Sequence, residues 1–143
     1  MPESGDASAT AMLGKVPIFA SLGEKVLRQL AAGAKDRRFG AGEKILTQGE
    51  KGIGLFLILE GKVEVRSKEK LLASLGPSQY FGEMALLDEE PRTADVVAIA
   101  PTRCLVISRW EFWGFLSDKP DAIRILLQET VRRLRATDRA FTE

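Results

Sequence analysis

Residues 81–94 read Phe-Gly-Glu-Met-Ala-Leu-Leu-Asp-Glu-Glu-Pro-Arg-Thr-Ala, and they do not follow the strand pattern of the sequence around them. Residues 82–86 predict one or two turns of helix, and Pro91 stops any helix because it has no amide hydrogen to donate. Residues 92–94 then lead back into a strand. The stretch therefore predicts a strand end, a short helix and a loop that returns to the sheet.

Three residues of this stretch suit a nucleotide. The amides at the start of a short helix and the guanidinium of Arg92 both match phosphate oxygens, and Gly82 allows a ligand to come close to the backbone. Glu83 accepts hydrogen bonds and therefore suits a sugar hydroxyl. Each feature alone is common, and the acidic residues 88–90 read as an exposed loop. Only the combination predicts a nucleotide site.

On both sides of this stretch, short segments rich in Val, Ile, Leu and Phe are separated by glycine and proline turns. Seven or eight strands at this spacing predict a sandwich or jelly roll. No helical pattern of sufficient length separates them, which argues against a parallel β-α-β sheet. The predicted strands are residues 37–39, 44–47, 55–59, 63–66, 71–75, 94–99 and 103–107.

The chain before the strands predicts a tail and one helix. Residues 1–12 are expected to be a disordered tail, so the domain is expected to span residues 13–143. Ser21 and Glu24 read as a capping box, in which the serine hydroxyl accepts a hydrogen bond from a helix amide. Apolar residues at helical spacing follow, and this helix is expected to end near Gly33.

Two further helices are predicted after the strands. Ser108 and Glu111 form a second capping box, and Pro120 can start a new helix because the first turn does not need its amide. One apolar stripe on this last helix has three candidate partners: the β core, a ligand base that it covers as a lid, or the same helix of a second chain. The stripe consists of Ile123, Leu127, Thr130, Leu134 and Thr137. The predicted fold is mainly β with flanking helices, a β jelly roll (double-stranded β-helix) with an N-terminal helix and two C-terminal helices.

The composition excludes several kinds of site. The 143 residues suffice for one domain, and the net charge of +1 makes no broad electrostatic demand on nucleic acid or membrane. The chain has no histidine and one cysteine, which excludes histidine acid–base catalysis, histidine metal sites and thiolate zinc sites. No apolar run reaches the roughly 20 residues of a membrane span, and the N-terminus lacks a secretion signal. We therefore expect a cytoplasmic protein with no metal or cofactor, no membrane segment and no nucleic-acid-binding element.

Two tryptophans and the cysteine are expected to be structural. Trp110 and Trp113 are of a kind that more often anchors a helix against the core than caps a base. Cys104 lies in a strand-like apolar run and reads as a buried core residue rather than a reactive thiol.

The stretch at residues 81–94 closely resembles the phosphate-binding cassette of cyclic-nucleotide-binding domains. Such domains occur in the bacterial catabolite activator, in protein kinase regulatory subunits and in nucleotide-gated channels. The family pattern is Phe-Gly-Glu-x-Ala-Leu, a short loop and Pro-Arg-x-Ala, and this chain matches it at residues 81–86 and 91–94. Residues 49–63 are similar to the glycine-punctuated hairpin of the family, and the resemblance extends from about residue 13 to residue 141.

The resemblance implies a role for each matching residue. Arg92 binds the cyclic phosphate together with backbone amides, and Glu83 binds the ribose 2′-hydroxyl. The amides are those around Gly82, Met84, Ala85 and Thr93, and the residues that line the base pocket are Val65, Leu72 and Ala73. Arg133 and Thr137 fall where the catabolite activator places base-contacting residues. Phe81 and Ala94 complete the implied set of ligand contacts.

The resemblance also implies a function, a regulatory domain that binds a 3′,5′-cyclic nucleotide and signals by movement of its C-terminal helices. A threonine after the arginine, here Thr93, favours cGMP in several members, but channel domains with the same threonine respond to cAMP, and we expect cAMP rather than cGMP. The alternative is a dimerisation or interaction module of this fold that binds no cyclic nucleotide, against which Glu83 and Arg92 argue. An enzyme such as a phosphodiesterase is disfavoured because the chain has no histidine for a di-metal site. The sequence leaves open a homodimer through the last helix and whether the chain is a complete protein.

Overall fold

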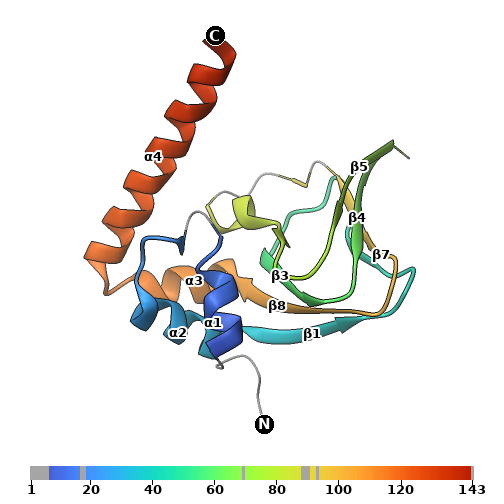
Figure 1. Cartoon of the computed structure of the whole chain (residues 1–143), viewed down its shortest axis with the longest axis horizontal. Coiled ribbons are helices and arrows are strands. Elements are labelled where there is room, and N and C mark those ends of the chain that lie inside the picture. Colours follow the sequence, from blue (N-terminus) through green and yellow to red (C-terminus); the bar gives the residue numbers. More distant parts are fainter. Residues whose placement is uncertain (1–6, 17–18, 69, 88–90, 93, 143) are drawn as a thin grey trace.

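Eight short strands enclose the interior of the molecule in the part of the chain that the computed structural model describes, residues 7–16, 19–68, 70–87, 91–92 and 94–142. They are β1 (Lys35–Phe39), β2 (Lys44–Leu46), β3 (Gly54–Glu60), β4 (Val63–Ser67), β5 (Lys70–Leu75), β6 (Tyr80–Phe81), β7 (Asp95–Ala98) and β8 (Thr102–Ser108). The strands form two four-stranded antiparallel sheets with the orders β1-β8-β3-β6 and β2-β7-β4-β5 (Figure 1). The predicted jelly roll is confirmed, and β6 pairs with β3 as its eighth strand.

The central strand β3 explains how the layers are held together. Its residues 55–59 are all apolar, which allows both faces of the strand to be covered. Leu55 and Leu57 pack with helices on one face, whereas Phe56 and Ile58 fill the space between the two sheets. The neighbouring strand β8 alternates in the same way. The first sheet therefore lies between a helical layer and the second sheet.

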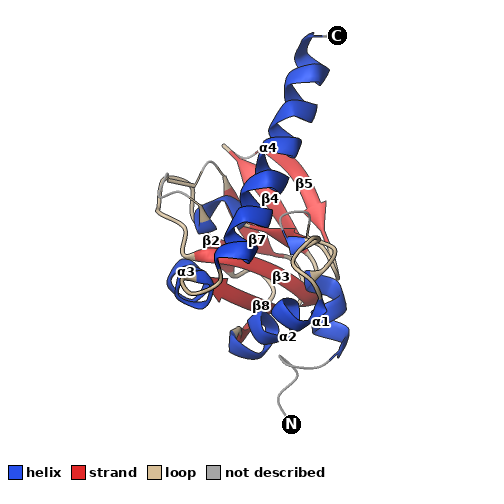
Figure 2. Cartoon of the chain, turned by 90° about the vertical axis from the view of Figure 1, so that its left-hand side faces the viewer, coloured by secondary structure: helices blue, strands red, loops and turns tan. Residues whose placement is uncertain are grey.

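Four α-helices and the short 3-10 helix η2 accompany the sheets in the described residues. They are α1 (Ala7–Leu13), α2 (Glu24–Gly33), η2 (Glu83–Leu86), α3 (Arg109–Leu116) and α4 (Pro120–Thr142). Figures 1 and 2 show α1, α2 and α3 gathered on the side of β8 that faces away from β4 and β5. The two predicted C-terminal helices are confirmed, and the N-terminal side carries two helices where one was predicted.

The helix α1 corrects the prediction of a disordered tail over residues 1–12. Ala9 and Leu13 are buried, and they belong to the same apolar cluster as residues of α2 and β3. This burial stabilises a helix that is too short to be stable by its own propensity. Residues 1–6 lie outside the described part, and the packed domain includes residues 7–12.

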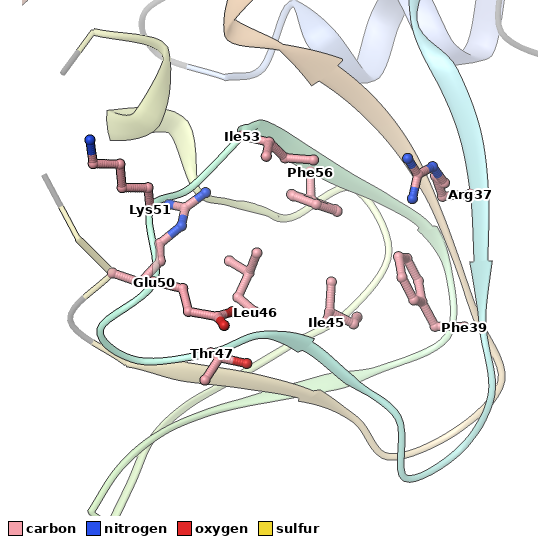
Figure 3. Close-up of a pocket in the computed structure, with 10 residues that line it drawn as sticks. Arg37, Phe39, Ile45, Leu46, Thr47, Glu50, Lys51, Ile53 and Phe56 are labelled. Atoms are coloured by element: carbon pink, nitrogen blue, oxygen red, sulfur yellow. The ribbon is translucent and has the colours of Figure 1, made fainter. Parts of the chain in front are cut away.

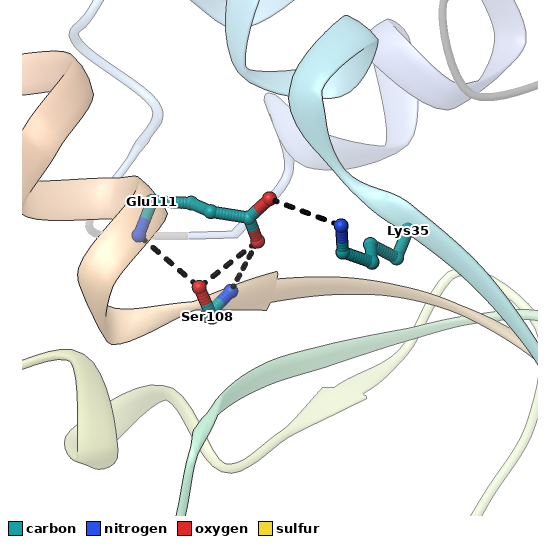
Figure 4. Close-up of polar contacts among 3 residues, drawn as sticks. All are labelled: Lys35, Ser108 and Glu111. Atoms are coloured by element: carbon teal, nitrogen blue, oxygen red, sulfur yellow. Dashed lines mark hydrogen bonds and ion pairs between the residues drawn. The ribbon is translucent and has the colours of Figure 1, made fainter.

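The capping box predicted at the start of α3 is confirmed. The amide of Glu111 donates to Ser108 Oγ at 3.1 Å, and the Glu111 carboxylate accepts from the amide of Ser108 (Figure 4). Glu111 Oε2 also lies 3.9 Å from Lys35 Nζ, so the start of α3 is linked to β1.

The capping box predicted at Ser21 is wrong. The helix α2 begins at Glu24 with Gly23 as its N-cap, and no side chain bonds the exposed amides there. Gly23 adopts φ +87, a conformation that glycine reaches without strain. The chain therefore enters the helix through a glycine turn two residues after the serine. The predicted end of this helix at Gly33 is confirmed.

The last helix, α4, begins at Pro120 as predicted, packs on α3 and then runs away from the sheets (Figures 1 and 2). Among the side chains of α4 that the structure describes, the buried ones are Ala122, Leu126 and Glu129. Of the predicted apolar stripe, Ile123 packs against the core, whereas Leu127 and Leu134 are 64% and 60% exposed. The β core is therefore not the partner of these two leucines, and the lid and the second chain remain as candidates.

Candidate functional site

Arg92 lies on a segment that pairs with a distant loop of the chain. Its amide donates to the carbonyl oxygen of Glu50 at 2.8 Å, and the amide of Gly49 donates to its carbonyl oxygen at 2.9 Å. Pro91, the preceding residue, forms a β-bridge with Lys51. These contacts join the glycine-rich hairpin and the arginine stretch into one structural unit.

The guanidinium of Arg92 lies between two glycines. A Cβ atom at Gly52 would be 2.2 Å from both Cζ and Nε of Arg92, and a Cβ at Gly82 would be 2.9 Å from its Nη2. The Nη2 group donates to the carbonyl oxygen of Gly54 at 3.1 Å. Because Gly82 directly precedes η2, this contact brings a half-buried positive charge to the start of the short helix.

The segment from Phe81 to Leu86 is anchored in the core. Phe81 stacks on Phe56 with 5.0 Å between ring centroids, so its side chain belongs to the cluster between the sheets. Ala85 and Leu86 are also buried, and the amide of Ala85 donates to the carbonyl oxygen of Gly82 at 3.1 Å. The predicted helical turn is confirmed as η2. The side chain of Phe81 therefore anchors the segment in the core. The amide of Ala85 is already hydrogen-bonded within the turn.

Trp113 joins α3 to this turn. Its Nε1 donates to the carbonyl oxygen of Leu86 at 2.6 Å, and its ring packs edge-on against Phe112. The prediction that this tryptophan anchors a helix is confirmed. The same prediction is wrong for Trp110, which is 65% exposed.

An open cavity of about 180 Å³ adjoins Arg92. Figure 3 shows the side chains of Ile45 and Leu46 on β2 pointing toward Phe56 on β3. The lining residues of the cavity are Arg37, Phe39, Ile45, Leu46, Thr47, Glu50, Lys51, Ile53, Phe56 and Arg92. The cavity therefore combines an apolar floor with charged groups of both signs.

The three residues implied to line a base pocket lie on β4 and β5. Val65 pairs with Ala73 across these strands and packs against the cluster between the sheets. Ala73 is exposed, and Leu72 is 51% exposed on the edge strand β5. None of the three lines the cavity beside Arg92. That cavity and the implied base pocket are therefore distinct places in the roll.

Five residues of the predicted site lie wholly or partly outside the described part of the structure. Thr93 is not described. Only the backbone is described for Glu83 and Met84 in η2, and for Arg133 and Thr137 in α4. The part of α4 that holds the last two points away from the sheets (Figure 1).

Ala94 and Asp95 return the chain to the second sheet. Ala94 is half-buried at the bend before β7. Asp95 accepts a hydrogen bond from the amide of Gln48 at 2.7 Å, and its other oxygen lies 3.5 Å from Lys44 Nζ. The Gln48 amide and, less strongly, the Lys44 charge hold the pKa of Asp95 below its ordinary value, against the opposite effect of burial. The carboxylate thereby fastens the end of the cassette to the segment before Gly49.

Sequence reasoning missed the residues that stand next to Arg92 in space. For Gly52 and Gly54 a signal existed, because residues 49–54 contain three glycines, and glycine leaves room for a neighbouring group. For Arg37 and Phe39 no such signal existed, because they reach the cavity from an edge strand whose place depends on pairing with β8.

The described residues also bear on two other kinds of function, metal binding and membrane insertion. In this part of the chain no group of three His, Cys, Asp or Glu side chains is placed to hold a metal ion. Among the same residues, no helix has both the length and the apolar character to cross a membrane.

The sequence model of the cyclic nucleotide-binding domain matches residues 36–119, a span that includes η2, Arg92 and most of the strands. The chain belongs to the cyclic nucleotide-binding domain family. Members of this family similar to the present domain are found among regulators and channels.

Two relatives are longer than this chain and match it over part of their length. A CRP-like cAMP-activated global transcriptional regulator of Mycobacterium tuberculosis is 30% identical over 132 residues, which is 89% of this chain and 59% of that protein. A cyclic nucleotide-gated potassium channel of Mesorhizobium japonicum is 33% identical over 122 residues, which is 85% of this chain and 34% of the channel. The domain thus spans only part of the length of these relatives.

Solved structures agree with this assignment. The N-terminal domain of a transcriptional regulator from Streptomyces coelicolor superposes with a TM-score of 0.84 at 31% identity, covering 90% of this chain and 93% of that one. The catabolite activator protein of Thermus thermophilus superposes with a TM-score of 0.70 at 33% identity, covering 88% and 62%.

Proposed function

We propose that this domain is a regulatory sensor that binds a 3′,5′-cyclic nucleotide. The observation that carries the proposal is the position of the Arg92 guanidinium between Gly52 and Gly82, at the start of η2. A planar guanidinium suits two oxygens of one phosphate, and the glycines let a ligand come close to the backbone. Relatives named as cAMP-activated and as cyclic nucleotide-gated support the same class of ligand.

Different residues bind the phosphate, the ribose and the base of the nucleotide. Arg92 binds the cyclic phosphate together with the amides of Gly82, Met84 and Thr93, and Glu83 accepts a hydrogen bond from the ribose 2′-hydroxyl. The base is bounded by Val65, Leu72, Ala73, Arg133 and Thr137. The ligand is bound and released without chemical change, so the domain acts as a switch and not as an enzyme.

We assign cAMP as the preferred ligand over cGMP. The M. tuberculosis relative is named for activation by cAMP. Thr93 follows the arginine, and a hydroxyl at that place can bond the amino group of guanine, so cGMP is the competitor that a test must include.

The proposed signal is a movement of the C-terminal helices. Trp113 bonds the end of η2 to α3, and α4 packs on α3, so a displacement of the cassette is passed to both helices. A ligand shifts such an equilibrium only through its difference in affinity for the two states. A tenfold shift requires a difference of about 1.4 kcal/mol.

A homodimer through α4 is the second part of the proposal. Leu127, Val131 and Leu134 are exposed at spacings of four and three residues, which is the spacing of a coiled-coil seam. An exposed apolar row of this kind marks an interaction surface. The same helix of a second chain would cover it with an identical row.

Calorimetric titration with cAMP, cGMP and AMP tests the ligand assignment. We expect binding of cAMP in the micromolar range or tighter, weaker binding of cGMP and no comparable binding of AMP, which lacks the cyclic phosphate. Arg92→Ala is expected to abolish binding of both cyclic nucleotides at micromolar concentrations. Arg38→Ala is the matched control, because Arg38 is an exposed arginine of β1 outside the cassette.

The outcome of this titration separates the two candidate functions. If neither cyclic nucleotide binds below about 1 mM, which is roughly −4 kcal/mol, the sensing proposal fails. The alternative, an interaction module of the same fold, would then rest on the exposed row of α4 alone. Equal binding by the Arg92→Ala variant would overturn the role given to this arginine.

A further inference from the structure

We propose that Gly52 is a positioning residue for Arg92, because its missing side chain keeps open the space that the guanidinium occupies. The inference rests on the proposed function, in which Arg92 binds the cyclic phosphate. It adds that the affinity for the nucleotide depends on a residue of the hairpin at 49–63, outside the cassette.

The distances at Gly52 leave no room for any side chain while Arg92 stays where it is. A Cβ atom there would lie 2.2 Å from Cζ and Nε and 2.3 Å from Nη2 of Arg92. Non-bonded carbon atoms need about 3.5–4.0 Å. Three atoms of one guanidinium are in conflict, so a methyl group at this position has to displace the whole planar group.

The other groups around the Arg92 guanidinium limit the direction in which it can be displaced. On the Gly82 side the space is already filled, because the site of a Cβ on Gly82 lies 2.9 Å from Nη2 and 2.6 Å from the carbonyl oxygen of Gly54. The same carbonyl accepts the hydrogen bond from Nη2. Among the described residues, the open direction is the cavity of about 180 Å³ that Arg92 lines. A displaced guanidinium therefore turns toward this cavity and leaves the start of η2.

Gly52 is also the position where a substitution reports on Arg92 without straining the backbone. Gly52 is not among the glycines with positive φ, so alanine can adopt its conformation. Gly82, in contrast, has φ +83, and a Cβ on Gly54 would lie 2.0 Å from the carbonyl oxygen of Ile107. Substitutions at Gly82 and Gly54 would disturb the main chain, whereas the atoms that a Cβ at Gly52 would meet belong to the end of a flexible side chain.

The test compares Gly52→Ala with Gly40→Ala by calorimetric titration with cAMP and cGMP. Gly40 is a loop glycine without positive φ, and a Cβ there would meet nothing within 4 Å. We expect Gly52→Ala to weaken binding by roughly tenfold or more, and Gly40→Ala to leave it unchanged. The urea midpoint of both variants without ligand is expected to stay close to that of the unchanged protein.

A double-variant cycle with Arg92→Lys separates positioning from a general effect on the loop. Lysine has no planar group to fill this space, so Gly52→Ala should cost clearly less affinity in the Arg92→Lys protein than in the unchanged one. Crystal structures of the unchanged protein and of Gly52→Ala without ligand should show the guanidinium moved and the loop at 49–54 in place.

The proposal is overturned if Gly52→Ala binds as tightly as the unchanged protein, or if it costs as much affinity in the Arg92→Lys protein as in the protein that keeps Arg92. It is also overturned if the crystal structure shows a shifted loop around an unmoved guanidinium. If the unchanged protein binds neither nucleotide, the proposed function fails instead. A displaced guanidinium in the crystal structure would then still support the positioning role of Gly52.

Discussion

Cys104 is a buried residue of β8 whose side chain lies between the two sheets. Burial and, to a lesser extent, the negative charge of Asp36 raise the pKa of its thiol to about 12. The thiolate is the reactive form, so we expect no reaction with an aromatic disulfide reagent at about pH 8 while the protein is folded. The absorbance of the released chromophore measures this, and the same protein in urea is the positive control. Prompt labelling of the folded protein would contradict the prediction.

Single residues of the site differ in how far the sequence predicts them. The role of Arg92 is predictable from local sequence. Arg92 follows a glycine and a predicted helix start by ten residues, and a guanidinium and helix amides both suit a phosphate group whatever the fold. The contact between Arg92 and Gly52 is not predictable in this way, because it depends on the pairing of residues 91–92 with residues 49–51. Local sequence patterns therefore predict which residue types a site contains. They do not predict which of these residues come into contact, because that depends on pairing between distant segments.

The two serines that were predicted to cap helices provide a matched pair of variants. Ser108 accepts from the amide of Glu111, whereas α2 is capped by Gly23 and Ser21 bonds none of its amides. We expect Ser108→Ala to lower the free energy of unfolding by about 1 kcal/mol. Ser21→Ala should change it by less than about 0.5 kcal/mol. Urea denaturation of both variants measures the difference, and equal losses would contradict the assignment of the caps.

The same pair shows what a capping pattern can and cannot predict. Both sites have serine followed three residues later by glutamate, so the sequence does not distinguish them. The structure does, because Ser108 ends β8 in extended conformation directly before the helix, whereas Gly23 turns the chain one residue before α2. A cap therefore depends on how the chain enters the helix, which local residue types only partly determine.

Trp113 is the contact through which α3 holds the turn of the cassette. Trp113→Phe keeps an aromatic ring but removes the donor to the carbonyl oxygen of Leu86, a hydrogen bond with a net value of about 1 kcal/mol. We expect faster amide hydrogen exchange in η2 and a lower free energy of unfolding by a similar amount. Trp110→Phe is the control, because Trp110 is mostly exposed and is expected to change neither quantity. Unchanged exchange in the Trp113→Phe variant would show that the ring alone holds the turn.

The arrangement of the whole molecule is the part that the strand pattern predicts least. Most strand positions follow from short apolar segments between turns, yet their order in the sheets does not. Lys35 at the start of β1 lies opposite Val106 in β8, so the first and the last of the described strands are neighbours. Helix α1 is likewise not predictable from its own sequence. It is too short to be stable alone, and burial against α2 and β3 stabilises it.

The direction of α4 leads to the prediction about the assembled protein. The helix leaves the roll with Leu127 and Leu134 exposed, so its apolar row contacts neither the core nor the cavity beside Arg92. Pairing of two such helices removes these side chains from water, and each buried leucine contributes about 1.5–3 kcal/mol. We therefore expect sedimentation equilibrium to show a dimer, and the double variant Leu127→Lys/Leu134→Lys to sediment as a monomer with an unchanged circular dichroism spectrum.

The control for this experiment is another exposed leucine. Leu71 lies on the edge strand β5 and is also about half exposed, at 49%, so Leu71→Lys replaces an exposed leucine by a charged residue on a different surface. This variant should remain a dimer if α4 forms the interface. Sedimentation with and without cAMP also tests the proposed signal. Movement of α4 on ligand binding should change the dimer dissociation constant. A monomer under both conditions would reject the interface, and the exposed row would then be left for the ligand base as its remaining candidate partner.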